Sequence, residues 1–201
     1  MSDCGTSSRV VCVSVGLTAP LVINGRRFLS GIRKTPVDGP VPVRALGLAG
    51  DEQADPSVHG GLGKAVYACP SEHLPFWSAE RRRRGLTELE EPIAPGLLGE
   101  NLLLAGLLER DLWVGDELRF AGSTCVLRVT APREPCYKLG AVLGFAQAAR
   151  VMARERRTGF YLAVDEPGAL QAGMAVHVTP GRRRLSLFEA IGAKWAKQKN
   201  W

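Results

Sequence analysis

Glycine and proline interrupt this chain every few residues, and this interruption constrains the fold more than any other feature. The 201 residues include 23 glycines and 13 prolines, and both residue types favour turns over long helices. Short apolar runs rich in β-branched residues lie between them, for example at 10–17, 41–46 and 125–130. Because these candidate strands do not alternate regularly with helices, a doubly wound α/β sheet is not expected. We predict a mostly β fold with a β-barrel-like core and peripheral helices.

A few helices are expected around this core. The segment 71–84 begins with a serine, which is a favourable N-cap, and ends in a run of arginines. The segment 139–156 repeats apolar residues with the period of a helix. Ser186 and Glu189 have the spacing of a capping box, which predicts a short basic amphipathic helix reaching to about Lys199.

The same pattern predicts a β domain over residues 1–180 and a basic helical segment over 181–201. No apolar run is long enough to cross a membrane, so no membrane association is expected. The polar residues 1–9 lack the basic-then-apolar layout of a signal peptide, and we expect a cytoplasmic protein. The five cysteines have no paired spacing, which argues against a disulfide framework and against a Cys-x-x-Cys zinc site.

The net charge of +6 bears on the partners of the protein. Much of the excess lies in two arginine runs, at 81–84 and 182–184. Such runs can bind nucleic acid, but no aromatic residues that would stack on bases interleave with them. No stable nucleic-acid binding is therefore expected, and the charge is equally compatible with a small anionic ligand.

The sequence around Cys136 indicates a chemical role more directly than the sequence around any other residue. Cys136 lies in the run 132–138, where two prolines stiffen a loop after a candidate strand. Arg133 and Lys138 flank the thiol, and positive charge favours the thiolate, the form that attacks electrophiles and binds soft metals. The alternative is a small buried cysteine at the end of a strand.

A second candidate site is the loop after residue 50, which combines acidic residues, a histidine and two glycines. The glycines allow backbone amides to approach a ligand closely, and an aspartate can orient the imidazole for proton transfer. An Asx-rich turn capped by the histidine is the alternative, and a metal site of Asp51, Asp55 and His59 fits no zinc or calcium template. The candidate residues of this loop are Asp55, His59, Gly60, Gly61 and Lys64.

Asn101 follows Gly99 and Glu100 and is the third candidate. Its amide offers a donor edge and an acceptor edge beside a flexible glycine, although the same three residues are common in ordinary turns. Lys64 lies three residues after Gly61 and can reach an anion held by the glycine amides, or it is simply a solvated lysine.

These motifs match those of a known family when they are taken in chain order. The matching segments are Gly31, Lys34–Val37, Gly39–Val41, Gly47–Asp55, His59–Gly61, Lys64–Val66, Pro70–His73, Gly99–Asn101, Val114–Asp116 and Pro132–Leu139. Together they resemble the MOSC (molybdenum cofactor sulfurase C-terminal) domain family, and within it the YiiM-like, hydroxylaminopurine-resistance branch. The resemblance extends over roughly residues 10–178, and its specificity lies in the ordered set of motifs.

The resemblance implies a MOSC-type β-barrel that binds a molybdopterin-type molybdenum cofactor; pyridoxal phosphate is not expected. It also implies a reductase of N-hydroxylated compounds, such as hydroxylaminopurines, amidoximes and hydroxylamines. Since no flavin, haem or iron–sulfur motif is present, electrons would come from an external donor protein, with a flavoprotein as the expected class. The sequence indicates no oligomeric state.

The resemblance also implies roles for single residues. Cys136 would be the molybdenum ligand, with Arg133 and Lys138 neutralising negative charge beside it. Proton donors would be Asp55 and His59. The remaining cofactor-binding residues would be Arg33 and Lys34 at the pterin phosphate, Gly60 and Gly61 through their amides, Lys64, and Asn101 at the pterin or the substrate.

Three departures from the usual pattern of the branch are visible. Val58 stands where a histidine pair often begins, and Cys69 stands where an aromatic residue usually precedes Pro70. The three-helix domain that commonly ends the branch is reduced to a remnant in 181–201. Two other functions stay open: a carrier of the cofactor or of sulfur without turnover, and a thiol enzyme with Cys136 as nucleophile and His59 as base.

Overall fold

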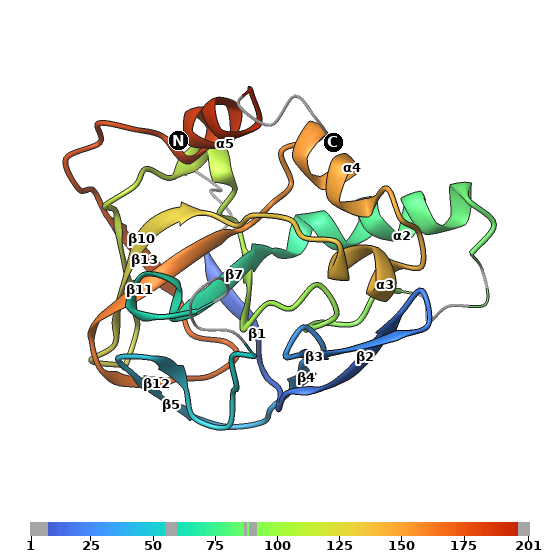
Figure 1. Cartoon of the computed structure of the whole chain (residues 1–201). Coiled ribbons are helices and arrows are strands. Elements are labelled where there is room, and N and C mark those ends of the chain that lie inside the picture. Colours follow the sequence, from blue (N-terminus) through green and yellow to red (C-terminus); the bar gives the residue numbers. More distant parts are fainter. Residues whose placement is uncertain (1–7, 55–59, 87, 89–91, 197–201) are drawn as a thin grey trace.

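The structure is a computed structural model that describes residues 8–54, 60–86, 88 and 92–196. Its centre is an eight-stranded sheet with the order β13-β9-β10-β11-β7-β8-β1-β4 (Figure 1). Neighbouring strands are antiparallel except for β7 and β8, which are parallel. The strands are β1 (Arg9–Val15), β4 (Thr35–Pro36), β7 (Val66–Pro70), β8 (Leu102–Ala105), β9 (Glu117–Phe120), β10 (Val126–Pro132), β11 (Phe160–Glu166) and β13 (Val176–Thr179). The predicted mostly β fold is confirmed.

Backbone hydrogen bonds between β1 and the residues before β13 close this sheet on itself. An antiparallel bridge joins Arg9 to Ala175. The Val10 amide donates to the Met174 carbonyl at 2.9 Å, and the Gly173 amide donates to the Val10 carbonyl at 2.8 Å. Closure removes the free strand edges that would otherwise present unpaired backbone groups. The expected barrel-like core is therefore present, with β4 as a short addition beside β1.

Two hydrophobic clusters lie on opposite faces of the same strands. Successive side chains of a strand point to opposite faces. On β8, Leu102 and Leu104 belong to the cluster inside the barrel, whereas Leu103 belongs to the cluster beneath the helices. On β11, Leu162 points inward and Tyr161 points to the helices. Burial of each large apolar side chain contributes about 1.5–3 kcal/mol, so these strands are stabilised from both sides.

In Figure 1 the helices lie on the right-hand side of the barrel, except for the C-terminal helix, which lies above it. None of the helices in the described ranges is long and apolar enough to cross a membrane. The α-helices are α2 (Leu74–Arg83), α3 (Lys138–Leu143), α4 (Ala148–Arg154) and α5 (Leu187–Ala196), and the short 3-10 turns are η1 (Leu62–Lys64), η2 (Ser71–His73) and η3 (Glu109–Asp111).

The expectation of one continuous helix over 139–156 is wrong. The segment forms two helices, α3 and α4, which are separated at Gly144. Gly144 has a φ of 85° and caps the end of α3 in the left-handed conformation, which glycine adopts without steric cost. The apolar period continues on both sides of the break because both helices pack on the same cluster, as the burial of Leu143 and Met152 shows.

The C-terminal helix begins as the capping box predicts. Ser186 Oγ accepts the Glu189 amide at 3.1 Å, and Glu189 Oε2 accepts the Ser186 amide at 3.0 Å. Leu187 and Ile191 are fully buried, so α5 is docked against the body of the protein. The division of the chain at residue 180 stays a prediction.

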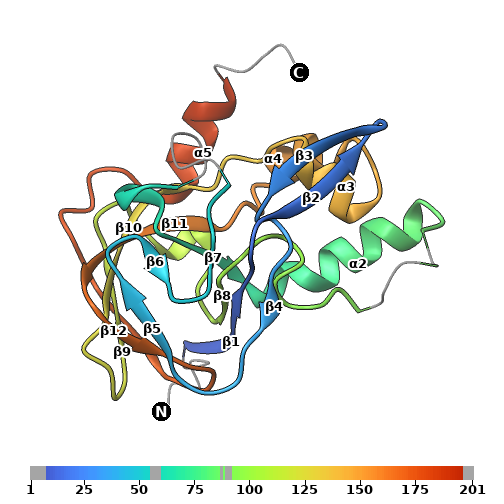
Figure 2. The same cartoon turned by 60° about the horizontal axis from the view of Figure 1, so that its bottom comes forward.

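Two smaller sheets complete the fold (Figure 2). A three-stranded sheet has the order β12-β5-β6, and a two-stranded hairpin pairs β2 with β3. The hairpin turns at Asn24 and Gly25, both with positive φ, and packs beside α3. Its strands are β2 (Ala19–Ile23) and β3 (Arg26–Ser30), and those of the other small sheet are β5 (Val41–Arg44), β6 (Gly47–Leu48) and β12 (Gly168–Leu170).

Candidate functional site

A cavity lies where the barrel wall meets the β2–β3 hairpin and α3. Together with the part that is open to solvent, it contains about 640 Å³ of space not filled by atoms. The lining side chains come from five chain segments and from Tyr161 on β11. These segments are 30–34, 51–54, 64–67, 98–101 and 133–138.

Cys136 contributes its thiol to the wall of this cavity. It is a half-buried cysteine that forms no disulfide with the described residues, and it lies between the end of β10 at Pro132 and the start of α3. The loop is fixed at both ends: the Arg133 amide donates to the Gly159 carbonyl at 3.1 Å, and the Leu139 amide donates to the Cys136 carbonyl at 3.0 Å. The predicted position of Cys136, on a loop that follows a strand, agrees with the structure.

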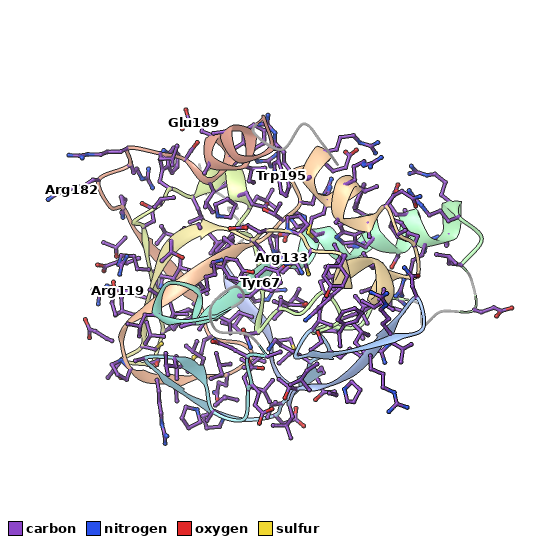
Figure 3. All side chains as sticks on the ribbon, in the orientation of Figure 1. Tyr67, Arg119, Arg133, Arg182, Glu189 and Trp195 are labelled. Atoms are coloured by element: carbon purple, nitrogen blue, oxygen red, sulfur yellow. The ribbon has the colours of Figure 1, made fainter. Side chains whose placement is uncertain are left out.

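Arg133 places a buried positive charge in the wall of the cavity. Only 5% of the residue is exposed, and Figure 3 shows it next to Tyr67. Its guanidinium lies 5.3 Å from the centre of the Tyr67 ring, and Nη1 lies 3.2 Å from the Met152 sulfur. No ion pair with an acidic side chain is formed by Arg133 within the described part of the chain. A buried charge without a counterion is costly, which favours an anionic ligand here.

Tyr67 does not supply the missing negative charge. Burial raises the pKa of its phenol well above the ordinary value, so the ring stays neutral. The hydroxyl donates instead to the Thr158 carbonyl at 2.9 Å. The Tyr67 ring also packs against Tyr161, with 5.8 Å between ring centres. The two tyrosines therefore form a rigid, uncharged wall around the arginine.

Asp51 in the cavity wall binds groups from three other segments of the chain. Its Oδ1 accepts the Gly16 amide at 2.9 Å and the Lys34 ammonium, and its Oδ2 accepts the Asn101 side-chain amide at 2.9 Å. Asn101 in turn accepts the Tyr67 amide on its side-chain oxygen at 3.1 Å. The ion pair between Lys34 and Asp51 is almost fully buried, with 7% and 6% of the side chains exposed. These contacts fix the positions of Lys34 and Asn101 at the cavity.

Two further lysines face the cavity from other elements. Lys64 Nζ lies 3.8 Å from a Glu134 carboxylate oxygen and 5.4 Å from the centre of the Tyr161 ring. Lys138 Nζ donates to the Leu29 carbonyl at 3.0 Å and so connects α3 with the hairpin. Cationic residues outnumber the carboxylates in the described lining, which gives the cavity a positive balance. The lining cations are Lys34, Lys64, Arg133 and Lys138, and the lining carboxylates are Asp51 and Glu52.

The arginine run of α2 contacts α3, the helix that follows Cys136. Arg81 is buried, and its guanidinium donates to the carbonyls of Val142 at 2.8 Å and Leu143 at 3.3 Å. These carbonyls belong to the last turn of α3, whose acceptors have no partner within the helix. Arg81 therefore holds the helix that follows Cys136. The other arginine run lies elsewhere, and Arg182 projects outward, away from Arg133 (Figure 3).

The structure brings most of the predicted site residues together. Six line the cavity: Lys34, Lys64, Asn101, Arg133, Cys136 and Lys138. Arg33 is exposed and does not contribute to the lining. Gly60 and Gly61 also lie outside it, and the Gly61 amide donates to Gln53 Oε1 at 3.1 Å. Asp55 and His59 lie outside the described residues, so their roles stay predictions.

The lining residues that the sequence did not assign to the site include Asp51, Tyr67 and Tyr161. Asp51 was considered only as a partner of the histidine or as a metal ligand, although it follows Gly50 in a turn next to the candidate loop. Tyr67 and Tyr161 are partners in the register of β7 and β11. Nothing next to them in the sequence indicates this pairing, because the two residues are far apart along the chain.

The donor set limits how the site can hold a metal. Among the described residues, no group of three or more histidine, cysteine, aspartate or glutamate side chains has the arrangement of a metal site. Cys136 offers one soft sulfur donor in a positively charged cavity. This donor set fits a metal that receives its other ligands from an anionic organic cofactor, which the surrounding lysines and Arg133 would bind.

Comparison with protein families and known proteins points in the same direction. The family model described as "MOSC domain" matches residues 55–177. The chain is 34% identical over 192 residues to the uncharacterized protein YflK of Bacillus subtilis, covering 95% of this chain and 82% of YflK. It is 32% identical over 166 residues to protein YiiM of Escherichia coli, covering 83% of this chain and 71% of YiiM.

Two further proteins extend this comparison. A protein named "Reductase" from Gibberella moniliformis is 31% identical over 177 residues, which cover 86% of this chain but 28% of that protein. The crystal structure of YiiM from Geobacillus stearothermophilus superposes with a TM-score of 0.72 at 29% identity, covering 96% of this chain and 86% of the other. The arrangement of strands and helices is thus shared over nearly the whole chain.

Proposed function

Because this chain belongs to the MOSC domain family and has YiiM proteins among its relatives, we propose that it is a molybdenum-cofactor-dependent reductase of N-hydroxylated compounds. The observation that carries the proposal is the position of one thiol: Cys136 lines a cavity with a positive balance, beside the buried Arg133. A relative named as a reductase supports the reaction class.

The residues present fit such a cofactor. Cys136 Sγ would bind the metal, and Arg133, Lys138 and Lys34 would hold the anionic groups of the pterin. When bound, the cofactor would supply two-electron transfer to the N–O bond of the substrate. The balance is R–NH–OH plus two electrons and two protons giving R–NH₂ plus water.

The chain itself must orient the substrate and supply protons. The neutral Tyr67–Tyr161 wall offers an apolar surface for a flat heteroaromatic or amidoxime group. Asp55 and His59 are the proposed proton donors. Electrons would come from an external donor protein of the flavoprotein class, and we propose that the reaction takes place in the cytoplasm.

Metal analysis of a variant series tests this function. The protein is produced in a host that makes the cofactor, and molybdenum and pterin are quantified in the wild type, Cys136→Ala and Cys125→Ala. Cys125 is a matched control because it is buried in the barrel interior and is absent from the cavity lining. We expect molybdenum in the wild type and in Cys125→Ala, and its loss in Cys136→Ala; stoichiometric molybdenum in Cys136→Ala would overturn the ligand assignment.

Turnover separates the reductase from the other candidates. The loaded protein is assayed with a hydroxylaminopurine and an artificial electron donor. Reduction with a loss in Cys136→Ala supports the reductase, whereas a loaded but inactive protein supports the carrier. A protein that takes up no molybdenum but shows metal-free thiol chemistry at Cys136 supports the thiol enzyme.

A further inference from the structure

Glu100 is a fully buried carboxyl group directly behind the cavity. None of its surface is exposed, and the residues on either side of it, Gly99 and Asn101, line the cavity. Its Oε1 accepts the Gly96 amide at 2.6 Å. Its Oε2 is buried and has no hydrogen-bond partner among the described residues. A buried, unpartnered carboxylate oxygen is costly unless it carries a proton.

The loop that contains Glu100 packs directly on another wall of the cavity. The Lys34 amide donates to the Gly96 carbonyl at 3.2 Å. Gly99 lies so close to Ile32 that an added Cβ would be 3.2 Å from the Ile32 side chain. A change of charge at Glu100 therefore occurs within the structure that surrounds the ligand space, not at a distant surface.

Four charged or titratable side chains interact electrostatically with Glu100 from the elements around it. Arg133 comes from the end of β10, Tyr67 and Cys69 from β7, and Cys12 from β1. Burial raises the pKa values of Tyr67, Cys69 and Cys12, so these three groups stay protonated near neutral pH. Arg133 stays positively charged throughout this range.

Glu100 behaves differently from these neighbours. Burial raises its pKa from 4.5 to about 7, and the increase is opposed by the backbone amides of Gly96, Glu100 and Leu98 and then by Arg133. Within this group of side chains, Glu100 is thus the one that changes charge near neutral pH. When it is ionised, it partly neutralises Arg133. When it carries a proton, the full charge of Arg133 is available to a ligand.

We propose that Glu100 couples anion binding to proton uptake: an anion that binds in the cavity beside Arg133 brings a proton onto the free Oε2 of Glu100. The identity of the natural anion rests on the proposed function, but the coupling does not. Two negative charges roughly 10 Å apart, at an effective dielectric constant of about 20–30, repel enough to weaken binding about tenfold. The same coupling raises the pKa of Glu100 when the anion binds, because linkage is reciprocal.

Sulfate is a suitable probe because, unlike phosphate, it does not titrate near neutral pH. Sulfate affinity is measured on the metal-free protein by amide NMR titration at pH 6.0 and pH 8.0. All variants carry Cys136→Ser, so that the thiol cannot contribute a titration. Glu100→Gln removes the charge and keeps an oxygen that accepts the Gly96 amide. Glu80→Gln is the matched control, because Glu80 is equally buried but is paired with arginines on α2.

The coupling predicts that the dissociation constant of sulfate changes with pH and that this change requires Glu100. With Glu100 present, the constant should be about fivefold higher at pH 8.0 than at pH 6.0, because the tenfold coupling is only partly expressed between these two pH values, and Glu80→Gln should behave the same way. In Glu100→Gln it should stay near the low-pH value at both pH values. A saturating amount of sulfate should also raise the titration midpoint of the ¹³C-labelled Glu100 carboxyl by about one pH unit.

Each other outcome overturns the inference. If Glu100→Gln retains the same pH dependence, another group takes up the proton. If sulfate shows no binding at the cavity, or equal binding at both pH values with Glu100 present, the coupling does not exist. Neither result depends on molybdenum, so failure of the coupling and failure of the proposed function are distinguishable.

Discussion

Replacing Asp51 with asparagine tests whether the buried ion pair with Lys34 holds the cavity wall together. The two side chains are 6% and 7% exposed, and Asp51 also accepts the amides of Gly16 and Asn101. The substitution leaves the Lys34 ammonium buried without its counterion, and breaking a buried pair in this way costs about 3–5 kcal/mol. Asparagine still offers one oxygen to a neighbouring amide, so we expect a loss of about 3 kcal/mol.

Urea unfolding measures this loss against a matched surface pair. Arg128 and Asp165 also form a hydrogen-bonded ion pair at 2.7 Å, but 43% and 32% of their side chains are exposed. Solvent screens such a pair, so Asp165→Asn should cost less than about 1 kcal/mol. The free energy of unfolding is taken from the transition midpoint and slope of each variant.

The double variant Lys34→Met with Asp51→Asn completes the test. Removing the lysine charge eliminates the unpaired ion that Asp51→Asn creates, so the double variant should be more stable than the sum of the single losses predicts. We expect a coupling of about 2 kcal/mol. The reasoning is refuted if Asp51→Asn costs no more than Asp165→Asn, or if the single losses simply add.

Three further predictions concern the body of the protein. Because the folded pKa of Glu100 is about 7 and the usual value is 4.5, folded Glu100 keeps a proton that the unfolded chain has released, and stability falls as the pH rises through this window. The difference in unfolding free energy between the wild type and Glu100→Gln should decrease by about 3 kcal/mol between pH 4.5 and pH 8; a constant difference would show that the carboxyl does not titrate there. Ile191→Ala should destabilise by about 2–4 kcal/mol because the side chain is fully buried, whereas Phe188→Ala, at a residue 44% exposed, should cost much less; equal losses in thermal unfolding would contradict the docking of α5. Gly159→Ala should lower the melting temperature by several degrees, since Gly159 has a φ of 66° and an added Cβ would lie 2.7 Å from the Tyr67 ring; an unchanged melting temperature would argue against this close packing.

Local sequence signals predicted the elements whose structure depends on neighbouring residues. The capping pair Ser186 and Glu189 forms as its spacing indicates, and the proline-stiffened loop presents Cys136 after a strand. The break at Gly144 was missed because the apolar period runs through both helices. A period records which residues face the core, and it does not record whether the backbone between them is continuous.

The parts of the site that sequence reasoning missed depend on contacts between distant segments. Asp51 binds groups from three other segments, and the pairing of Tyr67 with Tyr161 follows from the register of two strands. Neither the contacts of Asp51 nor the tyrosine pairing can be recognised from the neighbouring residues in the sequence. Glu100 stands beside a candidate residue in the sequence, yet only its burial and unpartnered oxygen distinguish it from a solvated turn residue.

The seam of the barrel, where backbone hydrogen bonds join residues 8–10 to residues 173–176, affects folding during synthesis. A ribosome must synthesise the chain as far as residue 176 before the last backbone bonds of the seam can form. Until then β1 has an exposed edge that can associate with strands of other nascent chains. Such distant pairing also slows folding. We therefore expect a newly made chain to be most prone to aggregation, and unready to receive a ligand, until its final strand emerges.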